Sequence, residues 1–189
     1  MEKFSRIKPE TGEIKVKKDK ILYGDDWTQL IKYEDWTIHK GKDFVICIPF
    51  LIEQNKFVIR DEYIPSFKLA EGTERHLACV GGQIEDGETP EEALIRELEE
   101  EAGIVLRPDY RVEFEKPLYI NKSSTTKCHM AILPLTEADY HEVEIRGDGS
   151  LVEKKSKTAF IEVKWVKSLL PSDIITDYML MKFKNYLNI

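Results

Sequence analysis

The stretch GQIEDGETPEEALIRELEEEAGI, residues 82–104, decides the fold expected for this chain. Thr89 and Glu92 have the spacing of a capping box, and Pro90 stands at the first helical position, so we expect a helix to begin at Thr89. The residues that follow favour a helix, and Gly103 stands where a left-handed C-terminal cap is expected. The stretch therefore predicts a helix of about three and a half turns.

The expected helix has an apolar side and an acidic side. Its apolar stripe, expected to pack inward, consists of Leu94, Ile95, Leu98 and Ala102. On a neighbouring side, at positions i, i+3 and i+4 and with the small Ala93 beside them, are Glu97, Glu100 and Glu101. Like charges at this spacing repel, and carboxylates without Cys or His suit a hard cation, Mg²⁺ or Mn²⁺ rather than Zn²⁺. The alternative is a solvated acidic face, which is the usual role of a run of glutamates.

The same stretch resembles the Nudix box, Gx5Ex7REUxEExGU with U aliphatic, at every specified position. So many fixed positions in one window make a specific signal. The resemblance implies an α/β class protein with the Nudix fold, a mixed β-sheet sandwiched between helices. It also implies hydrolysis of a nucleoside diphosphate linked to another group. The matching residues are Gly82, Glu88, Arg96, Glu97, Leu98, Glu100, Glu101, Gly103 and Ile104.

The resemblance also implies roles for individual residues. Arg96 would orient Glu97, Gly82 would shape the loop, and Glu85 would lie beside the substrate. Water and substrate phosphate oxygens would complete the coordination of the cation. The implied metal ligands are the carboxylates of Glu97, Glu100 and Glu101 and the main-chain carbonyl of Gly81.

A polar stretch at residues 137–158 is long for a connection, which indicates a functional or mobile loop. Nudix hydrolases often take a base or an extra metal ligand from a loop at this place. Glu153 is the nearest acid before the next expected strand, with Glu142 and Glu144 as alternatives. The candidates for accepting the proton of an attacking water are therefore Glu97, Glu100 and Glu153.

Residues 1–42 contain short alternating runs and scattered glycines, which predict a β-rich N-terminal extension before a Nudix domain at residues 43–189. The pattern LYGDDW and EDWTI resembles the N-terminal segment of ADP-ribose pyrophosphatases, which is often exchanged between two subunits. That resemblance implies a homodimer. Trp27 and Trp36 would then stack on a substrate base, or would simply pack.

The remaining chain alternates between strand and loop patterns. Strands are expected at residues 44–53, 56–63, 111–120, 126–135 and 160–166, with loops at 64–75 and 121–127. Arg60 ends the second strand, where it is either a surface arginine or a bidentate phosphate ligand. An amphipathic helix closes the chain, with Ser172 as its N-cap and with Ile175, Met179, Phe183 and Tyr186 toward the core.

Composition limits the partners. The 189 residues, 42% of them hydrophobic, suit one core, and a net charge of −7 with a pI near 5.3 argues against nucleic acid or an anionic membrane. The three cysteines are spaced as buried thiols, no signal peptide is seen in the N-terminal residues, and the longest apolar run is too short for a bilayer. We expect a cytoplasmic protein that binds a small nucleoside diphosphate derivative.

The substrate stays open at this stage. ADP-ribose or a nucleotide sugar is favoured by the layout, although Ile64 and Ala78 stand where ADP-ribose pyrophosphatases commonly carry arginine and glutamate. Dinucleoside polyphosphates, NAD(H), coenzyme A and modified nucleoside triphosphates are alternatives, because the box reads only the diphosphate. A regulatory Nudix module that binds a nucleotide without hydrolysis is an alternative of another class.

Overall fold

The strand β4 (Phe44–Leu51) lies at the centre of the computed structural model, which describes residues 20–25, 28–171 and 173–189. Successive side chains of a strand point to opposite faces, and here both faces are buried. Val45 and Cys47 pack into one apolar cluster, whereas Ile46 and Ile48 pack into another. The nearly continuous apolar run of β4 therefore builds two cores, one on each face of the sheet.

Seven strands of the described residues form one mixed sheet in the order β12-β5-β4-β10-β9, with β6 paired to β5 and β7 to β4. The strand β10 runs parallel to β4, and the other neighbours in this sheet are antiparallel. Besides β4, the strands are β5 (Lys56–Tyr63), β6 (Arg75–Ala78), β7 (Val80–Gln83), β9 (Leu118–Tyr119), β10 (Lys127–Leu135) and β12 (Lys157–Glu162).

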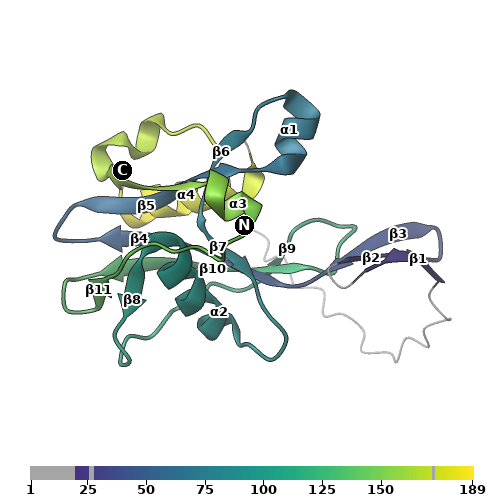
Figure 1. Ribbon diagram of the computed structural model, residues 1–189, viewed down its shortest axis with the longest axis horizontal. Coiled ribbons are helices and arrows are strands. Elements are labelled where there is room, and N and C mark those ends of the chain that lie inside the picture. The colour runs from purple at the N-terminus through teal and green to yellow at the C-terminus, as the bar shows by residue number, and fades with distance from the viewer. Residues whose placement is uncertain (1–19, 26–27, 172) are drawn as a thin grey trace, which may run out of the picture.

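Helices cover both faces of this sheet. The box helix, α2 (Pro90–Glu97), packs into the cluster that contains Val45, and α4 (Ile174–Tyr186) packs into the cluster that contains Ile46. This arrangement confirms the expected α/β/α sandwich (Figure 1). The smaller elements are α1 (Pro65–Glu71), α3 (Leu151–Lys155), a 3-10 helix at Val163–Ser168, and the pair of β8 (Ile104–Leu106) with β11 (Tyr140–Glu142).

The N-terminal segment forms a separate antiparallel sheet that projects beyond the body of the molecule (Figure 1). It contacts the body through His39 and Gly41 of β3. The His39 N–H donates to the Ser123 carbonyl at 2.8 Å, the His39 carbonyl accepts from Thr125 at 3.0 Å, and the Gly41 N–H donates to Thr126 Oγ1 at 3.2 Å. Residues 121–127, expected to be an exposed turn, thus hold this sheet in place. Its strands are β1 (Lys20–Gly24), β2 (Thr28–Tyr33) and β3 (Trp36–Gly41).

Three expected segments differ from the structure. The strand expected at residues 160–166 is shifted, since β12 ends at Glu162 and Val163–Ser168 form a 3-10 helix. Residues 64–75 contain the helix α1, which begins at Pro65 and ends at Gly72 with a φ of 76°, where a loop was expected. Proline at the first helical position and glycine just after the last one are local signals for this helix. Only Leu118–Tyr119 forms a strand within residues 111–120, because the neighbouring strand β10 pairs there over two residues only.

The last helix also begins one residue later than expected. Asp173 is its N-cap, and its Oδ1 accepts the N–H groups of Ile175 at 2.9 Å and Thr176 at 2.8 Å. Ser172, the expected cap, lies outside the described residues. The expected inward residues Met179 and Phe183 are buried, but Tyr186 is 48% exposed, because it lies in the final turn of the helix.

Truncation of Phe183 tests the core beneath α4. Phe183 is fully buried and its ring contacts Phe50 and Phe57, with centroids 5.5 and 5.2 Å away. We expect Phe183→Ala to lower the free energy of unfolding by about 3–5 kcal/mol. Asn185→Ala, at an exposed position in the same helix, is the control and should cost less than about 1 kcal/mol in the same denaturant titration. Equal losses in the two variants would contradict this placement of the core.

Candidate active site

The box helix begins and ends where the sequence predicts. Thr89 Oγ1 accepts the N–H of Glu92 at 3.2 Å, and Glu92 Oε2 accepts the N–H of Thr89 at 2.8 Å, which is a complete capping box. Gly103 ends the helical segment with a φ of 64°, in the left-handed region. Between them the helix widens into a π-helical turn at Leu98–Ala102, a feature often found at functional sites.

The wider turn and the packing of the helix change which side chains are inside. Leu94, Leu98 and Ala102 are buried as expected, but Ile95 is 37% exposed. Ala93, expected beside the carboxylates, is fully buried in the core in its place. The helix is therefore rotated about its axis relative to the expected orientation. As a result Glu97 and Glu101 are only 9% and 6% exposed.

A cavity of about 770 Å³ lies against this acidic side of the helix. Its volume is within the range of small-molecule sites. Its lining joins β7, the box helix and the segment around α3, so residues far apart in sequence meet there. The expected site residues that line it are Gly81, Gly82, Glu85, Arg96, Glu97, Glu100, Glu101 and Glu153.

Arg96 lies at the outer end of the carboxylate row. Its Nη1 donates to Glu97 Oε1 at 2.7 Å, which is the contact that an orienting role requires, and lies 3.4 Å from Glu100 Oε2. Its Nε donates to Glu88 Oε1 at 2.9 Å. Glu88 is a box position that sequence reasoning left without a role, and the structure shows that it anchors Arg96.

Glycines allow the carboxylates to approach the strand β7. A Cβ atom on Gly82 would lie 2.1 Å from Glu97 Oε1, so a side chain at this position would displace the carboxylate. The N–H of the preceding Gly81 donates to Glu101 Oε2 at 2.8 Å. The close approach of the helix to β7 therefore depends on Gly82, whereas Gly81 has no room for a side chain because it lies against the backbone of β4.

Burial perturbs the two inner carboxyl groups. Burial raises the pKa of Glu101 to about 9, against the opposing effects of Arg60 and the Gly81 N–H. Burial also raises the pKa of Glu97, although Arg96 acts in the opposite direction. Perturbed carboxyl groups that line a cavity are typical of functional sites.

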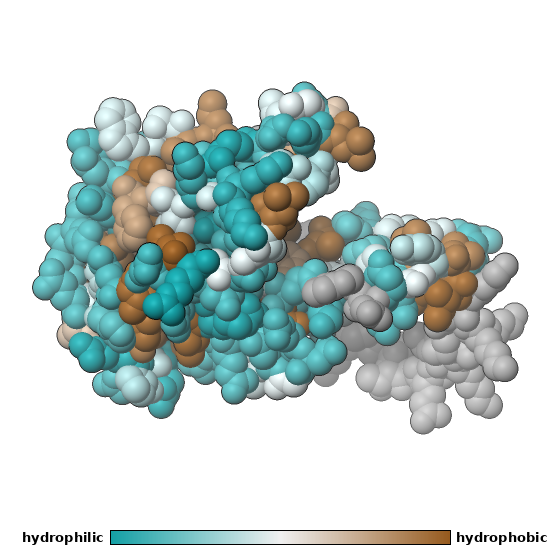
Figure 2. Space-filling view, in the orientation of Figure 1, coloured by the Kyte–Doolittle hydropathy of each residue, from teal (hydrophilic) through white to brown (hydrophobic). Residues whose placement is uncertain are grey.

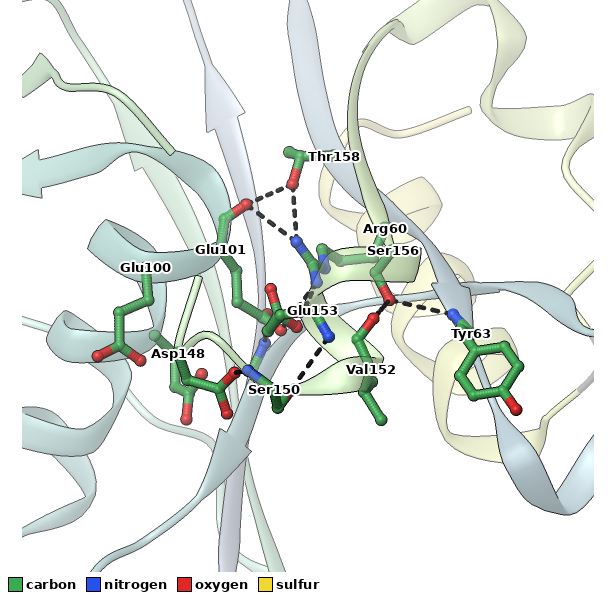
Figure 3. A network of polar contacts seen from close by, with 12 residues as sticks. Arg60, Tyr63, Glu100, Glu101, Asp148, Ser150, Val152, Glu153, Ser156 and Thr158 are labelled. Carbon is green, nitrogen blue, oxygen red and sulfur yellow. Dashed lines mark hydrogen bonds and ion pairs between the residues drawn. The ribbon is translucent and has the colours of Figure 1, made fainter. Parts of the chain in front are cut away.

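Arg60 is not at the surface. Its side chain is 2% exposed, its Nη2 lies 2.6 Å from Glu153 Oε1 and 3.3 Å from Glu101 Oε1, and both are ion pairs (Figure 3). The surface alternative for Arg60 is therefore wrong. Its guanidinium is also engaged by protein groups, so the structure does not show the free bidentate fork expected for phosphate binding.

The long polar loop folds into β11 and α3, and only part of it reaches the cavity. Glu153 in the first turn of α3 lines the cavity, because α3 packs against β5. Glu142 lies on β11, where its Oε1 accepts from Gln54 at 3.4 Å, and Glu144 is exposed. Of the three acids considered, only Glu153 is beside the box carboxylates.

Of the two tryptophans expected at a substrate base, only Trp36 is among the described residues, and it does not line this cavity. Trp36 lies on β3, 57% exposed and outside the set of cavity-lining residues, and Trp27 lies outside the described residues. Sequence reasoning missed Lys42 and Asp148, which do line the cavity. Lys42 stands just before β4, and basic residues at strand ends near a glycine-rich turn were the available signal.

Three other features of the described residues concern clustered metal ligands, membrane-spanning helices and disulfides. No group of three His, Cys, Asp or Glu side chains in residues 20–25, 28–171 and 173–189 converges as it would around a metal ion. No helix in the described part of the chain is long and apolar enough to cross a membrane. All three cysteines are buried free thiols, as expected.

The fold and the box define a Nudix domain. The sequence pattern of the NUDIX domain matches residues 45–169, and the chain belongs to this family, which confirms the resemblance. The 8-oxo-dGTP diphosphatase of Escherichia coli (strain K12) is 42% identical over 66 residues, 33% of this chain and 50% of that protein. The chain thus matches half the length of this relative. A crystal structure of an ADP compounds hydrolase has the same fold, with a TM-score of 0.64 and 16% identity over 92% of this chain and 96% of that one.

Glu62 gives a test of the electrostatics beside the site. It lies two positions after Arg60 on β5, hence on the same face of the strand, and burial raises its pKa to about 7. Because the pKa of Glu62 is higher in the folded than in the unfolded protein, its ionisation lowers the free energy of unfolding as the pH rises toward and through 7. We expect Glu62→Gln to raise the free energy of unfolding at pH 8 by on the order of 2 kcal/mol, and to change it little at pH 4.

The control is Glu71→Gln, which removes an exposed glutamate of α1. Denaturant titrations at both pH values should show little change for this variant. A Glu62→Gln variant with the same stability change at pH 4 and pH 8 would rule out ionisation of Glu62 as the cause.

Proposed function

We propose that this protein is a Mg²⁺- or Mn²⁺-dependent pyrophosphatase that cleaves the diphosphate of a nucleoside diphosphate linked to another group. The observation that carries the proposal is the meeting of Glu97, Glu100, Glu101 and Glu153 at one cavity. An intact Nudix box within a matched NUDIX domain supports the reaction class.

The charge balance of the site fits a divalent cation. Two arginines, Arg96 and Arg60, contact more acids than they can neutralise. The acids are Glu88, Glu97, Glu100, Glu101 and Glu153. Burial of excess negative charge is costly without a counter-charge. Oxygen donors without sulfur or imidazole match Mg²⁺ or Mn²⁺.

We assign the metal-holding role to Glu97, Glu100, Glu101 and the Gly81 carbonyl. Divalent ions bound there would supply charge neutralisation of the diphosphate and activation of a water molecule. The side chains must move closer together to bind an ion, and carboxylates on the wall of an open cavity have room to do so.

The protein groups contribute positioning and proton transfer. Lys42 and Arg96 are the basic side chains among the described residues that line the cavity, and we place Lys42 near a substrate phosphate. Glu153, with Glu97 and Glu100 as alternatives, accepts the proton of the attacking water. Gly82 and Glu85 lie on the cavity wall beside β7, where we place the rest of the substrate.

ADP-ribose or a nucleotide sugar is the proposed substrate. The separate N-terminal sheet supports it, since it is the part in which the chain resembles ADP-ribose pyrophosphatases. The similarity to 8-oxo-dGTP diphosphatase favours a modified nucleoside triphosphate as the second candidate. A panel with Mg²⁺ or Mn²⁺ decides between them: ADP-ribose, a nucleotide sugar, NADH, diadenosine polyphosphates, coenzyme A and 8-oxo-dGTP. Binding without product from any of these would instead support the regulatory module.

Replacement of Glu101 tests the metal assignment. We expect Glu101→Gln to lower kcat about 100-fold or more with the best substrate of the panel, because a neutral amide is a poor ligand for Mg²⁺. The protein should stay folded, because the amide has the size of the carboxyl group and its oxygen can still accept the Gly81 N–H. Chelation with EDTA should abolish the activity of the unaltered protein, and added Mg²⁺ should restore it.

Glu99→Gln is the matched control for this substitution. Glu99 is in the same π-helical turn but is exposed and lies outside the cavity lining. Its replacement should leave kcat within about twofold. Unchanged turnover in Glu101→Gln would refute the metal assignment.

We further propose a homodimer formed through the projecting N-terminal sheet. Large apolar side chains are exposed on this sheet and on β9: Ile21, Leu22, Tyr23, Leu30, Trp36 and Tyr119. Figure 2 shows hydrophobic surface on the projecting part. Exposed apolar side chains gathered in this way are typical of protein interfaces. A partner copy would also be the means by which Trp36 could reach a substrate base.

Buried thiols suit a reducing, cytoplasmic setting.

Light scattering coupled to size-exclusion chromatography tests the dimer. We expect twice the mass of the 22.0 kDa chain for the unaltered protein, and a shift toward the monomer for Trp36→Lys, because a charge would be buried at the interface. Lys164→Ala, on the opposite part of the molecule in the 3-10 helix, is the control and should remain dimeric. A stable monomer at micromolar concentration would end this proposal.

A further inference from the structure

Arg60 joins three segments that are far apart in the sequence. Besides its two ion pairs, its Nη1 donates to the main-chain carbonyl of Glu101 at 3.2 Å and to Thr158 Oγ1 at 3.0 Å (Figure 3). Thr158 is the register partner of Arg60 on β12, and its hydroxyl donates to the same Glu101 carbonyl. One guanidinium therefore contacts the end of the box helix, α3 and the adjacent strand.

Arg60 itself stays behind the cavity wall. It is 2% exposed and is not among the cavity-lining residues, whereas its partners Glu101 and Glu153 both line the cavity. Its Nε is buried without a hydrogen-bond partner among the described residues, so this arginine is kept inside at a cost. Because Arg60 does not line the cavity, it can act on a substrate only through Glu101 and Glu153.

The segment that carries Glu153 depends on such polar contacts. The helix α3 is five residues long and none of its residues is fully buried, so its apolar anchoring is weak. Its other ties to the sheet among the described residues include the Tyr63 N–H to Ser156 Oγ bond at 3.1 Å, the Arg75 Nη1 to Lys155 carbonyl bond at 2.5 Å and the Lys155 ammonium over the Tyr63 ring. All three lie at its C-terminal end. The Arg60 contact is thus the one of these ties that fixes the Glu153 carboxylate itself.

We propose that Arg60 is a positioning residue, not a phosphate ligand, and that it holds the Glu153 carboxylate at the cavity so that this group can accept the proton of the attacking water. With Oε1 of Glu153 bound to Nη2, the second carboxylate oxygen remains for the water. The planar fork of arginine also contacts Glu101, which sets the position of Glu153 relative to the box carboxylates. This inference rests on the proposed pyrophosphatase function.

A double-mutant cycle on the full chain tests the inference. Arg60→Met and Glu153→Gln should each lower kcat, Arg60→Met by about 10- to 100-fold, with KM little changed. The double variant should be no slower than the slower single variant, because Arg60 acts through Glu153. Arg60→Lys should recover part of kcat, since it keeps the charge but loses the fork. Arg111→Met, which removes an exposed arginine, is the control for loss of an arginine.

Hydrogen exchange supplies a readout independent of activity. The amides of residues 151–156 should exchange faster in Arg60→Met than in the unaltered protein or in Arg111→Met. Should Arg60→Met fail to fold, the same cycle and exchange measurement are made with Arg60→Lys. A raised KM with unchanged kcat, full additivity of Arg60→Met and Glu153→Gln, or unchanged exchange would overturn the inference. If the unaltered protein cleaves no member of the panel, the pyrophosphatase proposal fails, while the exchange measurement still decides whether Arg60 holds α3.

Discussion

Repulsion among carboxylates on one short helix is the constraint around which this structure is arranged. Glu97, Glu100 and Glu101 lie within two turns, and the inner two are buried. Isolated in water, such a row would cost a modest amount of free energy. In the folded protein the cost is larger, because burial withdraws the charges from solvent. The groups that offset this cost are Arg96, Arg60 and the N–H of Gly81.

Two arginines share this task from opposite directions. Arg96 holds Glu97 from the solvent side and is itself anchored by Glu88, while Arg60 holds Glu101 from within the sheet. The Gly81 N–H completes the arrangement. The compensation is incomplete, as the raised pKa values of Glu97 and Glu101 indicate. A site left short of positive charge in this way favours a bound cation, which is the physical basis of the proposed chemistry.

The fold explains how distant groups reach this row. The antiparallel pair β5–β12 places Arg60 opposite Thr158, and the polar segment before β12 folds back as α3 over β5. The pairing of β7 with β4 sets the glycine pair beside the end of the box helix. Because strands hold Arg60, Thr158 and the glycine pair, the contacts of these groups with the carboxylates depend on sheet register.

The sequence could predict those features of the fold and site that depend on residues close together in the chain. The capping box, the glycine end of the box helix and the strands β4 and β5 follow from local spacing and periodicity, and they were predicted. The α/β/α class was expected from the resemblance of the box to the Nudix family. The burial of Ala93 in place of Ile95 was not, because the rotation of a helix about its axis is set by the surface on which it packs. The helix α1 was missed although Pro65 and Gly72 are local signals.

By itself, the sequence determined which helix carries the acids and which residue types surround them, because capping, periodicity and the box are contained in a short stretch. Only the tertiary structure decided that Arg60 is inside, that Glu153 among the acids of its loop meets the box, and that Lys42 reaches the cavity. These outcomes arise from contacts between residues 41 to 98 positions apart, such as Arg60 with Glu101 and with Thr158. No local pattern encodes such contacts, since they exist only when the sheet has brought the strands together.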